Sequence, residues 1–76
     1  MVTAYIFVKA NTPEADRLLS EIEGIEGVVD AHIVAGDVDI ISKVIVDSPA
    51  DVKHIAADGI GNVAGVESTQ TYVAMD

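Results

Sequence analysis

The stretch Ala35-Gly36-Asp37-Val38-Asp39 lies between two halves of the sequence that resemble each other. A glycine between two acids at such a midpoint predicts a turn. A shift of 38 positions aligns the halves and pairs Gly27-Val28 with Gly65-Val66. It also pairs alternate residues of two expected strands: Val2 with Ile40, Ala4 with Ser42, Ile6 with Val44 and Val8 with Val46. The sequence therefore predicts two similar halves joined by a turn.

Each half has the pattern of a strand, a helix and a second strand. Alternation and strand-forming residues predict strands over 2–9, 29–35, 40–47 and 67–74. Apolar residues at helical spacing predict helices that begin at Thr12-Pro13 and Ser48-Pro49, with Thr12 and Ser48 as N-caps and each proline as the first helical residue. Gly24 is placed to end the first helix, and Asp51 to close a capping box in the second.

The order βαββαβ predicts an α+β fold of the ferredoxin-like type. In this αβ-sandwich, a four-stranded antiparallel sheet carries two helices on one face. The first and third strands are the most apolar, so we expect them at the centre of the sheet and the other two at its edges. With only 76 residues, the chain is expected to form a single domain over 1–76.

The other face of the predicted sheet is also apolar. Tyr5, Phe7, Ile41 and Ile45 lie on the side that the helices leave uncovered. Exposed patches of this kind mark interaction sites. A domain this short usually needs a staple, and the absence of cysteine excludes disulfides. The sequence therefore predicts a homodimer that buries these four residues between two sheets.

Acidic residues dominate the charge balance, with 13 Asp and Glu against 4 Lys and Arg and a net charge of -9. Such a surface repels nucleic acid and anionic membranes. No apolar run is long enough to span a bilayer, and no basic signal-peptide start is present, so we expect a cytoplasmic protein. The composition also resembles proteins of salt-loving archaea, in which salt screens self-repulsion. The alternative is that the acids simply keep a small domain soluble.

The sequence contains no constellation typical of a metal site or an enzyme. It has no cysteine, and His32 and His54 do not form a close ligand pair. Neither histidine can be paired with a nucleophile from the sequence. We therefore expect no metal, no cofactor and no catalytic residue, and interpret both histidines as structural.

One polar cluster is a candidate ligand site. It combines turn residues with the hydroxyls of the last strand: Gly36, Asp37, Asp39, Ser68, Thr69 and Thr71. Backbone N–H groups and hydroxyls can hold an α-carboxylate, and an aspartate can hold an α-ammonium. The cluster therefore fits a zwitterion. The alternative is an ordinary turn beside an ordinary edge strand, in which threonine is common.

Short segments along nearly the whole chain resemble the ligand-binding domain of the Lrp/AsnC regulators, also called the RAM domain. The segments are Thr3-Ala4-Tyr5-Ile6-Phe7-Val8, Ile25-Glu26-Gly27-Val28, Ala31-His32-Ile33-Val34, Gly36-Asp37-Val38-Asp39-Ile40, Lys43-Val44 and Gly65-Val66-Glu67-Ser68-Thr69-Gln70-Thr71. Each segment is short, and their order and spacing carry the resemblance.

The resemblance implies dimers formed through the sheet, often assembled into rings, with amino-acid effectors bound between dimers near the turn at residues 35–39. Gly36, Asp37 and Asp39 match the glycine-and-aspartate motif of the family, and Thr69 and Thr71 match hydroxyl positions. Full family members begin with a helix-turn-helix, whereas this sequence starts at the first strand of the sensing domain. It therefore resembles a stand-alone version, expected from a halophilic archaeon, that does not read DNA directly.

Together these features predict an amino-acid-binding regulatory domain that acts through its assembly. The alternative is an interaction module without a ligand of its own, which co-assembles with full-length Lrp/AsnC regulators or another regulated protein. An enzyme built on a dimeric ferredoxin-like barrel is a third possibility, disfavoured by the missing catalytic constellation.

Overall fold

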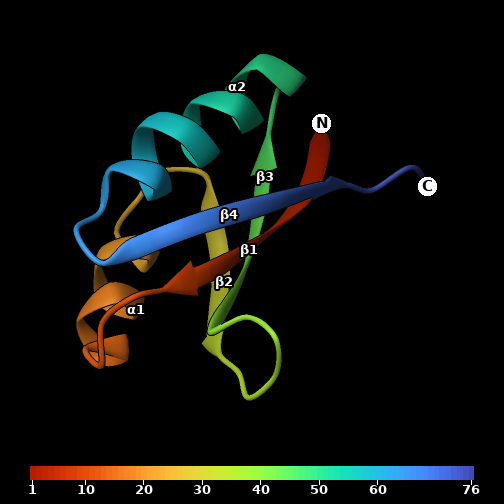
Figure 1. The fold of residues 1–76 in the computed structure, drawn as a ribbon. Helices are drawn as coiled ribbons and strands as arrows, with labels where there is room; N and C mark the ends of the chain where they lie inside the picture. Colours follow the sequence, from red (N-terminus) through yellow and green to blue (C-terminus); the bar gives the residue numbers. More distant parts are fainter.

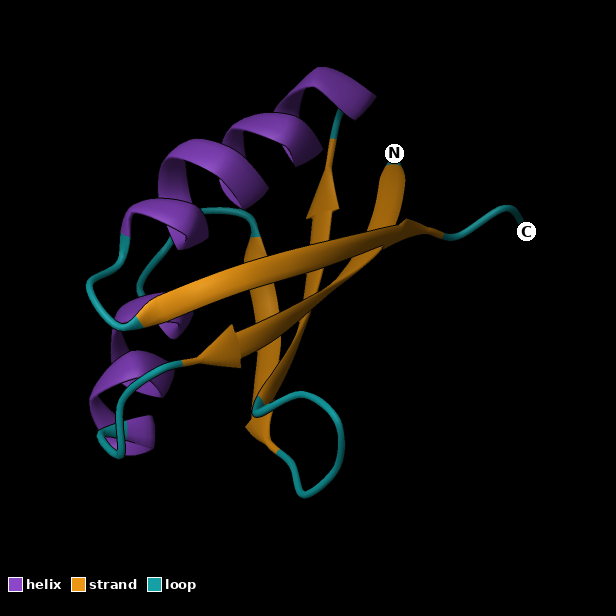
Figure 2. Cartoon of the chain, in the orientation of Figure 1, coloured by secondary structure: helices purple, strands orange, loops and turns teal.

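A computed structural model describes all residues, 1–76. It forms one four-stranded sheet with helical segments on one side (Figures 1 and 2). The elements in chain order are β1 (Val2–Ala10), α1 (Ala15–Glu23), β2 (Val28–Ile33), β3 (Ile40–Val46), α2 (Pro49–Lys53), the π-helix η1 (His54–Gly59), the 3-10 helix η2 (Ile60–Asn62) and β4 (Val66–Val73).

The strand order is β2-β3-β1-β4, and all three pairings are antiparallel. The predicted βαββαβ sandwich, with the first and third strands at the centre, is therefore confirmed. In the register, Ala4 pairs with Val44 of β3 and with Val73 of β4. Because side chains alternate along a strand, these residues lie on one face of the sheet and their neighbours on the other.

The helix-facing side of the sheet carries the core. Its buried apolar residues are Ala4, Ile6, Val8, Leu18, Ile22, Ala31, Ile40, Val44, Val52, Ile55 and Ile60. Each fully buried aliphatic side chain contributes roughly 1.5–3 kcal/mol, so this small core supplies most of the favourable free energy of folding. The one buried polar residue, Ser42, donates its hydroxyl hydrogen to the Ile6 carbonyl at 3.0 Å and is thus satisfied.

The internal repeat is visible in the backbone. Gly27 and Gly65, which the 38-residue shift pairs, have φ angles of 99° and 101° and are the only residues with positive φ. Each precedes an edge strand. A Cβ atom at Gly27 would lie 2.6 Å from Ile55 Cδ1, and one at Gly65 would lie 2.7 Å from Thr12 Cγ2. Both positions therefore favour glycine for conformation, and a larger residue would also displace the neighbouring side chain.

The two helices begin differently. As predicted, Ser48 caps α2, since its hydroxyl oxygen accepts a hydrogen bond from Asp51 N–H at 3.4 Å and Pro49 is the first helical residue. The prediction that Thr12 caps the first helix is wrong, because α1 begins at Ala15 after a Glu14 cap without a side-chain bond. Thr12 instead accepts a hydrogen bond from Glu14 N–H at 3.2 Å, which forms a turn before the helix.

The second helical segment continues from α2 into the π-helix η1. In a π-helix the backbone bond spans five residues, which brings residues five apart onto the same side. Ile55 and Ile60 are five apart, and both are buried against the sheet. The wider turn thus keeps both isoleucines in the core. No helix of the structure is long and apolar enough to cross a membrane.

Candidate functional site

The sheet face away from the helices carries an apolar cluster. By the register, Tyr5 and Phe7 of β1 and Ile41 and Ile45 of β3 lie on this face, as predicted, and Tyr72 of β4 pairs with Tyr5. The Phe7 and Tyr72 rings are 5.1 Å apart at 58°, a favourable tilted arrangement. We call these five residues the open-face cluster.

All aromatic residues of the chain belong to this cluster, since the sequence has one Phe, two Tyr and no Trp. Tyr5 is 38% exposed and Tyr72 54% exposed, so two of the three rings reach the surface of this face. Tyr72 was not predicted from the sequence. The alternation of β4 was the available signal, because it places Tyr72 opposite Tyr5.

The loop between β2 and β3 closes on itself at its base. Val34 N–H donates to the Asp39 carbonyl at 2.9 Å, and Asp39 N–H donates to the Val8 carbonyl at 2.9 Å. The Asp39 carboxylate accepts a further hydrogen bond from Ala10 N–H at 2.7 Å. Asp39 therefore fastens the loop to the end of β1, and its carboxylate already has a backbone partner.

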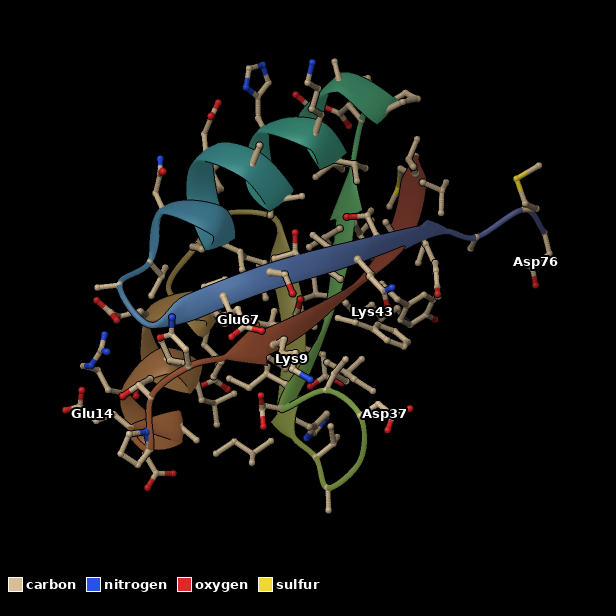
Figure 3. All side chains as sticks on the ribbon, in the orientation of Figure 1. Lys9, Glu14, Asp37, Lys43, Glu67 and Asp76 are labelled. Atoms are coloured by element: carbon tan, nitrogen blue, oxygen red, sulfur yellow. The ribbon has the colours of Figure 1, made fainter.

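A hollow of 520 Å³, here called the loop hollow, lies between this loop, the end of β1 and β4. Its lining combines charged, polar and apolar side chains: Phe7, Lys9, Asp37, Val38, Ser68, Thr69 and Gln70. Figure 3 shows Lys9 on β1 beside the loop that carries Asp37. A cation, a carboxylate, a hydroxyl and an amide thus border one space.

The charges of the loop hollow are not neutralised by each other. Arg17 pairs with Glu14 and Glu21 at 3.3 and 2.7 Å, but Lys9 has no carboxylate within 4.0 Å. Asp37 likewise has no basic partner within that distance. In a chain of net charge -9, a lysine without a carboxylate partner is a free binding group for an anion.

The structure brings only part of the predicted site together. Asp37, Ser68 and Thr69 border the loop hollow, and Asp39 lies at the base of the loop. Gly36 is exposed, and no atom outside Gly36 and its two chain neighbours lies within 4 Å of the place that a Cβ atom would occupy there. Thr71 borders a different hollow, on the helix-facing side of β4, because it pairs with the core residue Ile6.

Lys9, Gln70 and Val38 were not predicted as site residues. Lys9 pairs with Ser68 across β1 and β4, so both side chains project from the same face. Alternation along β1 assigns Lys9 to the uncovered face, and this signal was available in the sequence. No signal in the sequence places Asp37 near Lys9, because that proximity depends on the course of the loop.

The chain matches the Lrp/AsnC ligand binding domain over residues 3–76. It is 31% identical over 78 residues to an uncharacterized HTH-type transcriptional regulator of Pyrococcus abyssi, a match that covers 97% of this chain and 51% of that protein. The chain thus spans about half the length of this relative.

Solved structures share the fold. The crystal structure of TTHA0845 from Thermus thermophilus superposes with a TM-score of 0.94 at 24% identity, covering 100% of this chain and 95% of that one. The regulator NMB0573 from Neisseria meningitidis, solved as a complex with L-Met, gives a TM-score of 0.86 at 16% identity, covering 99% and 50% of the two chains. On the sequence match over residues 3–76, this chain belongs to the family of Lrp/AsnC ligand binding domains, which is related to transcriptional regulators.

Proposed function

We propose that this chain is an effector-binding regulatory domain that binds a free amino acid in the loop hollow. The observation that carries the proposal is the pair of opposite, unneutralised charges, Lys9 and Asp37, on one hollow. The α-carboxylate of an amino acid would bind the Lys9 ammonium, and its α-ammonium would bind Asp37. Ser68 and Gln70 supply further hydrogen bonds.

The apolar part of the lining can contact the side chain of a bound amino acid. Phe7 and Val38 border the same hollow as the two charges. Binding sites of this size combine apolar walls with a few placed polar groups. Gly36 contributes open space at the loop rather than a contact. We assign Asp39 to holding the loop, because Ala10 N–H donates to one of its carboxylate oxygens and Asp39 does not line the loop hollow.

Phe7 links the ligand to assembly. Its ring borders the loop hollow and also packs against Tyr72 in the open-face cluster. A ligand that repositions this ring changes the surface available to a second copy of the chain. We therefore propose that the effector acts on sheet-to-sheet homodimers, and on rings built from them, rather than on a reaction. The complex of the Neisseria meningitidis regulator with L-Met involves a protein of the same fold.

A thermal-shift screen with the twenty amino acids tests the proposal. A ligand that binds only the native state raises the melting temperature by mass action, with about 2.7 kcal/mol gained at 100 times the dissociation constant. We expect at least one hit, and we expect Lys9→Gln and Asp37→Asn each to weaken it about tenfold or more. Both side chains are exposed, so the melt without ligand should hardly change.

Asp16→Asn is the matched control, because Asp16 is an exposed acid on α1 that borders no hollow. It changes the net charge as Asp37→Asn does and should leave the ligand shift intact. The proposal fails if no amino acid shifts the melt, or if the shift survives undiminished in both site variants.

A second candidate function is a pure interaction module that pairs its sheet with that of a full-length Lrp/AsnC regulator. The exposed aromatic rings of the open-face cluster favour it. Tyr72→Glu tests this surface, since Tyr72 is exposed in one chain but would bury a charge in a sheet-to-sheet pair. Light scattering should show dissociation in this variant and none in Ser20→Glu on α1. A monomeric parent protein at micromolar concentration would remove both sheet-pairing proposals.

A further inference from the structure

A second hollow, of 330 Å³, lies on the opposite side of β4 from the loop hollow, between that strand and the second helical segment. We call it the helix hollow. The helix borders it with Lys53, Ala56 and Ala57, spaced as one helix face. The strand borders it with Thr69 and Thr71, spaced as one strand face. Its volume is at the low end of the range of about 300–1,000 Å³ for ligand pockets.

The repeat within the chain provides an internal comparison. The 38-residue shift pairs Ala56 and Ala57 with Leu18 and Leu19 of α1. Leu18 is fully buried and Leu19 packs against the core, and neither borders any hollow. Because α1 begins at Ala15 and α2 at Pro49, 34 residues apart, the shift pairs these residues in sequence only. The small side chains of Ala56 and Ala57 leave space beside the second helical segment.

The lining of the helix hollow contains one basic residue and no acid. No aspartate or glutamate borders it, although the chain has 13 of them. Lys53 has no carboxylate within 4.0 Å. The hydroxyls of Thr69 and Thr71 make no hydrogen bond to another protein group within 3.5 Å. The lining of the hollow is thus mainly apolar, with the lysine and the two threonines as its only cation and hydroxyl donors and no acid for an ammonium.

We propose that the helix hollow binds a small aliphatic carboxylic acid without an amino group, such as a branched 2-oxo acid. Its carboxylate pairs with Lys53, and its oxo oxygen accepts a hydrogen bond from a threonine hydroxyl. Its branched end occupies the space left by Ala56 and Ala57, against Val52. This site differs from the loop hollow, with which it shares only Thr69, because there Asp37 selects a ligand that carries an ammonium.

Titration of the ¹⁵N-labelled full chain with 4-methyl-2-oxopentanoate, followed by amide chemical shifts, tests the site. We expect saturable shifts at Lys53, Ala57 and Thr71. L-leucine should shift these amides about tenfold more weakly, because the hollow has no acceptor for its ammonium. The uncharged alcohol 4-methylpentan-1-ol should bind weakly for want of a carboxylate.

Three variants sharpen the test. Ala57→Leu adds a larger side chain to the lining of the hollow and should abolish the shifts. Lys53→Gln and Thr71→Val should each weaken binding, by about tenfold for the lysine, while an unchanged melt shows that they are folded. Lys43→Gln, which makes the same change in net charge on the other face of the sheet, should bind like the parent chain.

The proposal is overturned if the acid produces no saturable shift up to about 10 mM. It is also overturned if the shifts gather at Lys9 and Asp37, which would assign the acid to the loop hollow. The proposal is likewise overturned if a folded Lys53→Gln or Thr71→Val variant binds the acid as strongly as the parent chain. Because these two side chains are exposed, the test does not depend on whether Ala57→Leu folds.

Discussion

Asp39 and Asp37 are two residues apart but have different roles. The Asp39 carboxylate accepts Ala10 N–H at 2.7 Å, and Asp37 has no such bond. A hydrogen bond to a charged group contributes about 1.5–3 kcal/mol, so we expect Asp39→Ala to lower the free energy of unfolding by roughly that amount. Asp37→Ala should change it by less than about 0.5 kcal/mol. Urea unfolding of both variants measures the difference, and equal values would contradict the assignment of Asp39 to the loop base.

Gly27 and Gly65 also differ from Gly36 in how strongly the fold depends on them. Gly27→Ala and Gly65→Ala must place a Cβ atom at positive φ and within 2.6 and 2.7 Å of a neighbouring side-chain atom. We expect each to lower the free energy of unfolding by roughly 1–3 kcal/mol. Gly36→Ala is the control, because its φ is not positive and its surroundings are open. Denaturant midpoints that fall equally in all three variants would refute this distinction.

At the scale of elements, α1 and α2 differ in how their N-termini are capped. Ser48 caps α2 through Asp51 N–H, whereas no side chain caps α1. Ser48→Ala should therefore lower the free energy of unfolding by about 1 kcal/mol. Ser20→Ala, at an exposed position of α1, should leave it unchanged or raise it slightly because alanine favours the helix. Thermal melts of both variants decide this, and a Ser48→Ala melt identical to the parent would show that the cap contributes nothing.

The elements also show what the sequence could and could not predict. The βαββαβ order and the apolar character of both faces of β1 and β3 were enough to place these strands at the centre. The start of α1 was misplaced, since Thr12 can bond an N–H in a turn as well as in a cap. The π-helix was missed, although the five-residue spacing of Ile55 and Ile60 was a sign of it.

The candidate site was only partly predictable for a related reason. Asp37 and Ser68 were identified because a turn and a strand end share one edge of the fold. Lys9 was missed, since an isolated lysine at the end of a strand resembles any solvated residue. Thr71 was grouped with Asp37, although its pairing with the core residue Ile6 places it on the helix-facing side of β4. Separating the two hollows required the tertiary register.

For the whole molecule, charge is the dominant feature, with a net charge of -9 over 76 residues. Salt shortens the screening length from about 10 Å at 0.1 M to about 3 Å at 1 M, so repulsion within the folded chain falls. We expect the melting temperature to rise by several degrees between roughly 0.1 and 2 M NaCl, since 1 kcal/mol corresponds to about 4–8 °C in a domain of this size.

A double variant, Asp16→Lys with Glu23→Lys, is the matched control for this salt effect. Both acids are exposed on α1 and unpaired, and replacing two negative charges by two positive ones changes the net charge from -9 to -5. Its melting temperature should rise less with salt. A salt-independent melt of the parent chain would refute the adaptation to high salt that the composition suggests.

The strand order makes the two similar halves inseparable. Every pairing in the sheet joins a strand of the first half to a strand of the second, and β1 pairs only with β3 and β4. The β2–β3 hairpin is the only local pairing, and the other two require closure over long stretches of chain, which slows folding. A cut between Gly36 and Asp37 would turn the β2–β3 pairing into one between separate peptides, so neither peptide would contain two paired strands. The two halves are therefore one cooperative unit, because each strand finds its hydrogen-bonding partners only in the other half.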